Sequence, residues 1–167
     1  MTINIRNYEL RDWEELITGV VLKENENWVL IHEIPADYSL DGYLLINKQQ
    51  ITDHFKDEET DQKELVLSLK KYQELLPENF ELASVESMLK QIESQYQLIG
   101  VQDEEEILHI GTIQSIVANE LRIHHIAADG IPDPSMVMPT FLTDIQTIGF
   151  GSDYLQSVSL LYKYRMR

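Results

Sequence analysis

The chain has 167 residues, of which 43% are hydrophobic and 25% charged, so it can form a packed core in one domain or two small ones. Its formal net charge of −16 argues against a nucleic-acid partner and an anionic membrane surface, because binding phosphates requires clustered Lys and Arg. The absence of cysteine excludes disulfides, thiol nucleophiles and zinc sites with cysteine ligands.

The beginning of the chain carries no basic stretch followed by a long apolar run, and no window approaches the roughly 18 apolar residues of a membrane span. We therefore expect a cytoplasmic protein that does not associate with membranes.

In the first half of the chain, alternating apolar residues predict a hairpin of strands at 17–23 and 28–34, then a strand at 43–47. Residues 51–55 carry only a weak strand signal. A helix with Thr60 as its N-cap follows, and its helical spacing of apolar residues continues to Leu76, just before Pro77.

The second half of the chain begins with a predicted helix from Ser84 to about Gln97. The acidic run 103–106 separates this helix from a second hairpin, with strands at 111–117 and 120–126. Strands at 135–138 and 145–150 come next, and a last helix starts at Ser152 as its N-cap.

A shift of 92 residues aligns 19–72 with 111–164 without gaps and gives 13 identities in 54 positions. Typical residue usage would give roughly 3 or 4 at one arbitrary offset. The identities include Gly19 with Gly111 and Asp41 with Asp133. An internal duplication explains this match, and a chance alignment of two β-rich segments is the alternative.

The fold class predicted from this pattern is α+β, with two related small antiparallel β units, each closed by a helix, and a connecting helix. The first unit, with its N-terminal segment and closing helix, is expected at 1–76. An acidic helical connector is expected at 77–106, and the second unit with a C-terminal helix at 107–167. The net charge of 53–106 is −10, which indicates a solvated acidic face or a surface for a basic partner.

The strand pattern resembles small β-barrels of the SH3 or Sm-like kind. It also resembles bacterial proteins of no assigned activity that carry an Ile-x-x-Ile-x-Phe-Gly-x-x-Tyr-Leu segment after such strands. The residues that carry the resemblance lie at 19–21, 28–34, 41–46 and 145–150. It implies tandem SH3/Sm-like barrels and, for an Sm-like module, RNA contacts through basic or histidine loop residues. The acidic charge opposes such contacts, so we carry over no functional residue.

Histidine and aspartate residues in the second copy suggest a metal or small-ligand site. His109 lies near the start of the predicted hairpin that contains His124, and Asp129 and Asp133 follow this hairpin in a loop. Two observations oppose a metal site: His109 aligns with Ile17 in the other copy, and aspartates in tight loops often accept backbone amides. We expect no catalytic set and no cofactor, and keep these four residues as weak candidates.

A candidate interaction face lies on the strand at 28–34. By strand alternation, Val29 and Ile31 share the core face, and Trp28, Leu30 and His32 share the opposite one. The corresponding positions of the second copy are Glu120, Arg122 and His124, which are polar. The apolar face therefore needs cover, from another part of the chain, a protein partner or a second copy.

These observations predict a non-catalytic protein-binding or regulatory protein whose negative field attracts basic partners. A specific form is an acidic inhibitor or immunity-type protein that covers a basic, nuclease-like surface. The alternative is an enzyme or small-ligand protein that uses the His109, His124 and Asp129 region.

Overall fold

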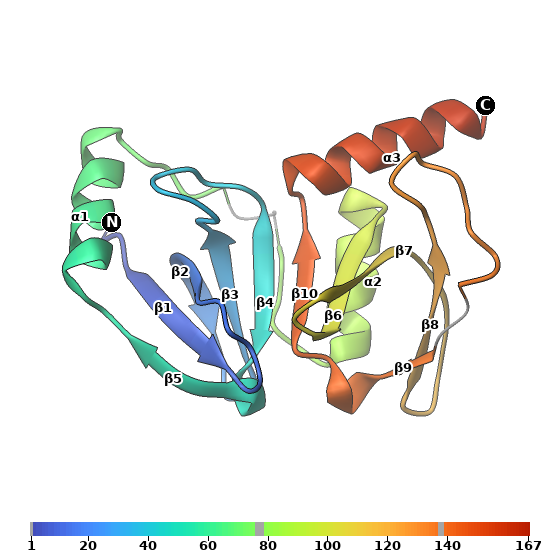
Figure 1. Cartoon of the computed structure of the whole chain (residues 1–167), viewed down its shortest axis with the longest axis horizontal. Coiled ribbons are helices and arrows are strands. Elements are labelled where there is room, and N and C mark those ends of the chain that lie inside the picture. Colours follow the sequence, from blue (N-terminus) through green and yellow to red (C-terminus); the bar gives the residue numbers. More distant parts are fainter. Residues whose placement is uncertain (1, 76–78, 137–138) are drawn as a thin grey trace. The chain divides into compact units, whose positions relative to one another are not determined.

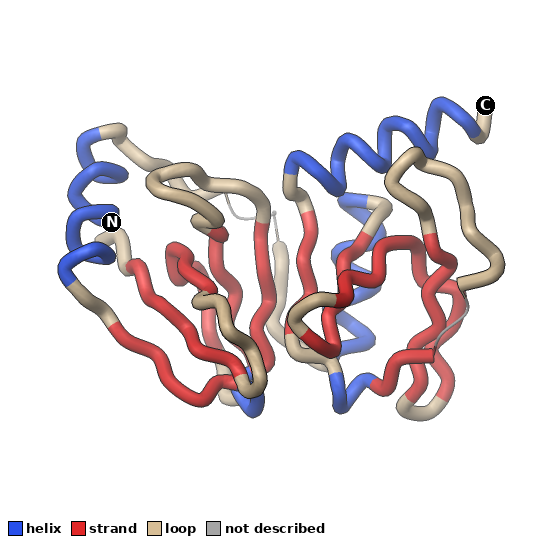
Figure 2. The backbone as a smooth tube through the Cα atoms, in the orientation of Figure 1, coloured by secondary structure: helices blue, strands red, loops and turns tan. Residues whose placement is uncertain are grey.

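The computed structural model describes residues 2–75, 79–136 and 139–167. The chain divides into two compact units, Met1–Leu82 and Ala83–Arg167, each with five antiparallel strands (Figure 1, Figure 2). This division after residue 82 differs from the expected segments 1–76, 77–106 and 107–167. The central helix and the strand that follows it belong to the second unit, because that strand pairs with the next hairpin.

The first unit has the strand order β5-β1-β2-β3-β4, and its helix follows the last strand, β5. A single turn of 3₁₀ helix, η1, links β4 to β5. The bounds are β1 Ile5–Leu10, β2 Ile17–Glu24, β3 Trp28–Glu33, β4 Tyr43–Asn47, η1 Lys48–Gln50, β5 Ile51–Phe55 and α1 Glu58–Leu69.

The second unit opens with a helix and then repeats the same strand order, as β10-β6-β7-β8-β9. A 3₁₀ turn again stands before the last strand, and a helix again follows it. The bounds are α2 Val85–Tyr96, β6 Ile99–Glu104, β7 Ile107–Val117, β8 Glu120–His125, β9 Pro139–Phe141, η2 Leu142–Asp144, β10 Thr147–Phe150 and α3 Asp153–Arg165.

The two units share backbone contacts at the predicted offset of 92 residues. The amide of Ile34 donates to the Thr18 carbonyl at 2.8 Å, and the amide of Ile126 donates to the Ile110 carbonyl at 3.0 Å. The ladder of β2 with β3 shifts register between residues 21 and 23, and that of β7 with β8 shifts between 113 and 115. The two central hairpins therefore follow equivalent chain paths.

Gly19 and Gly111 match in sequence because each lies against the neighbouring strand. A Cβ at Gly19 would lie 2.7 Å from the His32 carbonyl oxygen, and a Cβ at Gly111 would lie 2.0 Å from the His124 carbonyl oxygen. Real Cβ atoms do not approach backbone oxygens so closely, so both positions require glycine.

The offset of 92 does not hold for the helices that end the units. Asp57 is the N-cap of α1 and Ser152 is the N-cap of α3, so the helix starts differ by 95 residues. The prediction of Ser152 as a cap is confirmed, and that of Thr60 is wrong. The segment from Asp133 to η2 is two residues longer than that from Asp41 to η1, and the segment from η2 to Ser152 is one residue longer than that from η1 to Asp57; together they cause the change. The sequence matches between 61–72 and 153–164 therefore join positions that are not equivalent.

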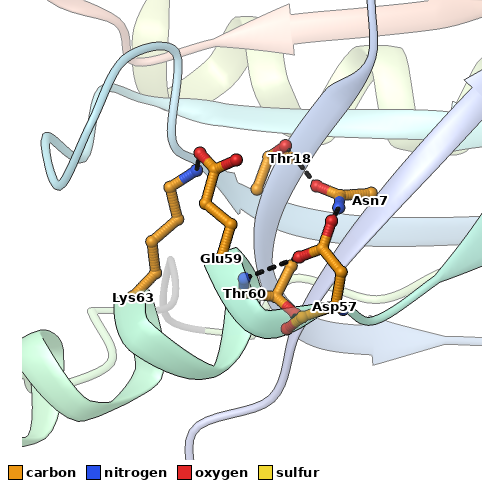
Figure 3. Close-up of polar contacts among 6 residues, drawn as sticks. All are labelled: Asn7, Thr18, Asp57, Glu59, Thr60 and Lys63. Carbon is orange, nitrogen blue, oxygen red and sulfur yellow. Dashed lines mark hydrogen bonds and ion pairs between the residues drawn. The ribbon is translucent and has the colours of Figure 1, made fainter.

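A polar network fixes α1 to the sheet of the first unit (Figure 3). Asp57 accepts the amide of Thr60 at 2.8 Å, and Thr60 accepts the amide of Asp57 at 2.8 Å, which forms a capping box. The second carboxylate oxygen of Asp57 accepts from Asn7 on β1 at 3.2 Å, and Asn7 accepts from Thr18 on β2 at 2.6 Å. The helix cap and two strands therefore share one partly buried network.

Each unit packs its last helix over a matching isoleucine. Leu67 of α1 packs in a cluster with Ile34, and Val158 of α3 packs in a cluster with Ile126. A further cluster of the first unit lies around Val29 and Ile31, which confirms the predicted core face of β3. Its buried members are Tyr8, Leu10, Ile17, Val29, Ile31, Leu44 and Ile46.

Most predicted strands and helices are present, with three corrections. The first strands of the two units, β1 and β6, were not predicted as strands. The strand predicted at 135–138 is wrong in its first half, because residues 134–135 form a turn; residues 137–138 lie outside the described part of the chain. The helix predicted to reach Leu76 ends at Leu69; Leu76 and Pro77 lie outside the described residues.

The α+β class with antiparallel strands is confirmed. The predicted closed barrels are not observed, since the strand order in each unit is linear and the end strands do not pair with each other in the described residues. Among the helices of the described segments, none is long and apolar enough to cross a bilayer.

Candidate functional site

The four residues proposed as weak metal candidates do not converge. His109 lies on β7 and is 5% exposed, whereas His124 on β8 is exposed. Successive side chains of a strand point to opposite faces, so His124 turns away from the buried side of β8. No group of three or more metal-ligating side chains exists in the part of the chain that the structure describes.

Both aspartates of this set stabilise turns. Asp129 accepts the amide of Ile131 at 3.0 Å. Asp133 accepts the amide of Ser135 at 3.0 Å and its hydroxyl at 2.6 Å, and these bonds lower the pKa of the Asp133 carboxyl. The turn interpretation of these residues is therefore supported by direct contacts.

His125, which the sequence argument did not select, is the buried partner of His109. The two rings meet edge to face with centroids 5.4 Å apart, and Nε2 of His109 lies 3.5 Å from Oδ1 of Asp103. His125 is 7% exposed, and its Nε2 has no hydrogen-bond partner among the described residues. Burial, followed by the nearby His109, lowers the pKa of His125, so the ring is held in its neutral form.

A partly open hollow of about 230 Å³ lies beside this histidine pair, between β7, β8 and the loop after β8. His125 contributes to its lining, but the Nε2 atom itself is shielded from solvent. A ligand in the hollow would therefore not reach that nitrogen without a rearrangement. The lining residues are Thr112, Ile113, Gln114, Ile123, His124, His125, Asp133, Pro134 and Met136.

The position equivalent to His125 in the first unit is Glu33. Both residues end a central strand, and the carbonyl of each accepts an amide from an aspartate, Asp41 or Asp133, at 2.9 Å. Burial, with the negative charge of Asp41 as a second cause, raises the pKa of Glu33 to about 7. One backbone site thus carries a carboxyl in one unit and an imidazole in the other, and each environment disfavours the charged form.

His32, the neighbour of Glu33, lies within an aromatic cluster. Its ring stacks on Tyr43 at 4.9 Å, and its Nδ1 lies 3.0 Å from the Tyr72 hydroxyl. Burial lowers the pKa of His32. These contacts give His32 a packing role that joins β3, β4 and the segment after α1.

The candidate interaction face of β3 is covered. Trp28 is 4% exposed and Leu30 is fully buried, and only His32 of the three is partly accessible. In the second unit the equivalent Arg122 and His124 are exposed, as the alternation predicts. Trp28 and Leu30 therefore do not form an open surface for a partner.

Surfaces that are open to a partner lie at the first hairpin of each unit. In the first unit, Glu14, Glu15 and Leu16 are exposed between β1 and β2. In the second unit, Glu104 and Glu106 are exposed at the turn between β6 and β7, and Ile107 and Leu108 expose 42% and 46% of their areas.

The negative charge of the first of these surfaces extends onto neighbouring strands. Glu9 of β1 lies directly opposite Asp53 of β5 in the ladder, and both side chains are exposed. Like charges at directly opposed positions of a sheet repel each other. A cationic group of a partner on this face would therefore reduce the repulsion between Glu9 and Asp53.

Strand alternation could have identified His125, because it lies two and four residues after the core residues Ile123 and Leu121. The raised pKa of Glu33 and the exposure of Leu108 have no comparable signal in the sequence, since both depend on tertiary packing.

No protein-family model, no curated protein and no solved structure matches this chain.

Proposed function

We propose that this chain is a non-catalytic protein-binding or regulatory protein whose partner presents a basic surface with apolar side chains. The observation that carries the proposal is the repeated surface at the first hairpins, which combines exposed carboxylates with exposed leucine and isoleucine side chains. We name it the hairpin surface; it comprises Glu14, Glu15 and Leu16 in the first unit and Glu104, Glu106, Ile107 and Leu108 in the second.

Charge and apolar area contribute differently to such binding. The net charge of −16 accelerates encounter with a basic partner and repels acidic ones. Burial of the leucine and isoleucine side chains supplies the affinity that persists when salt screens the charges. An inhibitor or immunity-type protein that covers a basic enzyme surface is the specific form of this proposal.

The strand order supports a relation to SH3- or Sm-like units whose sheet is not closed into a barrel. Both units have the strand order in which the last strand pairs with the first, and both place a one-turn 3₁₀ helix before that last strand. In this proposal the units are two copies of one ancestral module that presents its first hairpin to proteins.

The enzyme alternative has less support. It requires His109, His124 and Asp129 to act together, whereas His124 is exposed on the opposite face of its strand and Asp129 serves a turn. Elemental analysis of the purified protein tests it, since a stoichiometric transition metal would favour the enzyme over the proposed binding role.

The binding proposal is tested on an array of basic peptides that either carry or lack large apolar residues. The variant Glu14→Lys/Glu15→Lys/Leu16→Ser/Glu104→Lys/Glu106→Lys/Leu108→Ser changes every residue of the hairpin surface except Ile107. We expect the unmodified chain to prefer basic peptides with apolar residues and the variant to lose at least about tenfold in affinity.

The control Glu26→Lys/Asp144→Lys changes exposed carboxylates elsewhere and should keep the preference. Circular dichroism establishes that both variants remain folded. Equal binding by the surface variant and the control, or binding that ignores the apolar residues of the peptides, would contradict the proposal.

A further inference from the structure

The C-terminal helix α3 is apolar on two sides. Leu155 and Val158 are buried in the second unit. Four large apolar residues are nevertheless exposed on the same helix, Tyr154 by 49%, Leu160 by 68%, Leu161 by 39% and Tyr164 by 73%. At 100° per residue, these four fall within an arc of about 120° that faces away from the buried side. Among the described residues this stripe of α3 is mostly exposed, although Leu161 also lies against Gly130.

The helix α1 of the first unit carries a second stripe. Its buried residues are Thr60, Lys63 and Leu67, whereas Leu65 and Leu69, one turn apart, expose 60% and 73% of their areas. The side of the helix that carries these two leucines also includes Glu58 and Asp61, which are exposed. The stripe of α1 is therefore apolar with an acidic beginning.

The charges of the two helices are complementary when the helices run antiparallel. The first turn of α1 contains Glu58, Glu59 and Asp61, and the last turn of α3 contains Lys163 and Arg165, with Arg167 just beyond. At the other ends, Lys70 and Lys71 follow α1, and Asp153 begins α3. A parallel arrangement would instead place acids beside acids and bases beside bases.

The lengths of the two helices also match. With 12 residues in α1 and 13 in α3, each spans roughly 18–20 Å. A second copy of this chain therefore presents to α3 a partner with equal length, opposite charge in antiparallel order and exposed leucines at helical spacing.

We propose that the chain self-associates, with α1 of one copy packed antiparallel on α3 of a second copy. The contact joins two different surfaces, so two copies can form it reciprocally in a dimer or can extend it from copy to copy. It uses neither hairpin surface, and a dimer can therefore still bind the partner of the proposed function.

An anionic membrane is the competing occupant of α3, because a helix with exposed Leu and Tyr and a basic end can lie on such a surface. The net charge of −16 opposes this alternative, since the rest of the chain is repelled by anionic lipids. Contact with a second copy would bury the exposed apolar residues of both α3 and α1, whereas a membrane would leave those of the acidic α1 exposed.

Sedimentation velocity of the full chain over a concentration series up to about 500 μM tests the proposal, a range that detects micromolar association. Measurement at 0.15 M salt limits the long-range repulsion between two acidic copies to a Debye length of about 8 Å. We expect the mass to rise from monomer with concentration. A monomer throughout this range, including one that sediments with phosphatidylserine vesicles, would overturn the proposal.

Two charge reversals and their mixture test which helices meet. Lys163→Glu/Arg167→Glu at the C-terminal end of α3 and Glu58→Lys/Asp61→Lys on α1 should each weaken self-association at least about tenfold, because like charges then face each other. When the two variants are mixed, the unmodified α3 of one can pair with the unmodified α1 of the other. We therefore expect the mixture to associate although neither variant does alone, which general damage to folding could not produce.

An apolar pair of variants completes the test. Leu160→Ser/Tyr164→Ser should abolish most association, whereas Val117→Ser, which removes an exposed apolar residue at the end of β7, should leave it unchanged. Association that survives Leu160→Ser/Tyr164→Ser, or a mixture that stays monomeric, would contradict the proposed contact.

Discussion

The strands β3 and β8 are equivalent: each is the second strand of the central hairpin of its unit. They differ most on the face opposite the core face that both strands have. In β8, the buried residues Leu121 and Ile123 alternate with Arg122 and His124, which face solvent. In β3, all four residues from Trp28 to Ile31 are buried. Strands with the same backbone path can therefore be either buried on both faces or exposed on one face. The side chains on that one face determine which of the two occurs.

A second difference concerns titration. Glu33 and His125 end these two strands, with equivalent backbone bonds to Asp41 and Asp133. Burial raises the pKa of one and lowers the pKa of the other. At these equivalent positions, loss of solvent contact thus penalises a negative charge in the first unit and a positive charge in the second.

The largest expected effect contrasts Trp28 with its counterpart Glu120. Trp28→Ala should lower the free energy of unfolding by about 3–5 kcal/mol, because it leaves a cavity where a buried indole packs. Glu120→Ala removes only a surface ion pair with Arg122 and should change stability by less than about 1 kcal/mol. Urea denaturation of both variants measures the difference, and similar losses would mean that the two strands are not distinguished by burial.

The matched glycines provide the next test. Gly111→Ala should cost about 3 kcal/mol, since its Cβ would meet the backbone oxygen of His124 at 2.0 Å and force the strands apart. Gly19→Ala should cost somewhat less, because the nearest backbone atom to its Cβ, the His32 carbonyl oxygen, lies at 2.7 Å. Gly100→Ala is the control, with its closest contact at 3.0 Å to the flexible end of Leu108. A neutral Gly111→Ala in thermal denaturation would contradict the shared strand contact.

The N-caps of the two final helices should differ by a smaller amount. Asp57→Ala removes a capping box and the bond to Asn7, and should cost about 2 kcal/mol. Ser152→Ala removes one bond to the amide of Leu155 and should cost about 1 kcal/mol. Chemical denaturation of the two variants under identical conditions gives the comparison; a larger loss for Ser152→Ala would show that the network around Asn7 adds nothing.

The smallest expected effect is in the dependence of stability on pH. The folded chain holds the Glu33 proton up to a pKa of about 7, above the value of 4.5 for a free side chain. The protonated carboxyl therefore stabilises the fold at low pH, and this contribution is lost as the pH rises from 4.5 through 7. His125 acts in the opposite direction, because its lowered pKa removes stability as the pH falls below the ordinary histidine range.

Glu33→Gln separates these two effects. It should raise the free energy of unfolding at pH 8 by about 1 kcal/mol and leave it nearly unchanged at pH 4.5. The acid-side loss of stability assigned to His125 should persist in this variant. Denaturant midpoints measured from pH 4 to pH 9 check both expectations. Unchanged stability at alkaline pH would mean that the carboxyl of Glu33 is fully solvated in solution.

The repeated hairpin and its core face could be predicted from sequence because strand alternation records burial directly. Val29, Ile31, Leu121 and Ile123 have the predicted burial. The first strand of the first unit, β1, escaped prediction because a buried polar residue, Asn7, interrupts the apolar pattern. Asn7 is tolerated there because Asp57 and Thr18 satisfy its amide, and that arrangement cannot be inferred from local sequence.

The helix register was misjudged for a related reason. An ungapped alignment cannot allow for loops of different length, so Thr60 was paired with Ser152 although Asp57 is the cap. The candidate site shows the same limit. The residue types His and Asp were visible in the sequence. Whether their side chains converge depends on the strand face that each histidine occupies and on turn bonds such as that of Asp133 to Ser135.

One edge strand of each unit, β5 in the first and β9 in the second, affects how copies of this chain can meet. β9 is three residues long and begins with Pro139, which has no amide proton to offer, and β5 presents Asp53 and His54 on an exposed strand. Edge strands that are short, charged or contain proline disfavour edge-to-edge β-pairing between molecules. Crowding in a cell should therefore lead to reversible association through side chains, and amyloid-like growth from these two edge strands should be suppressed.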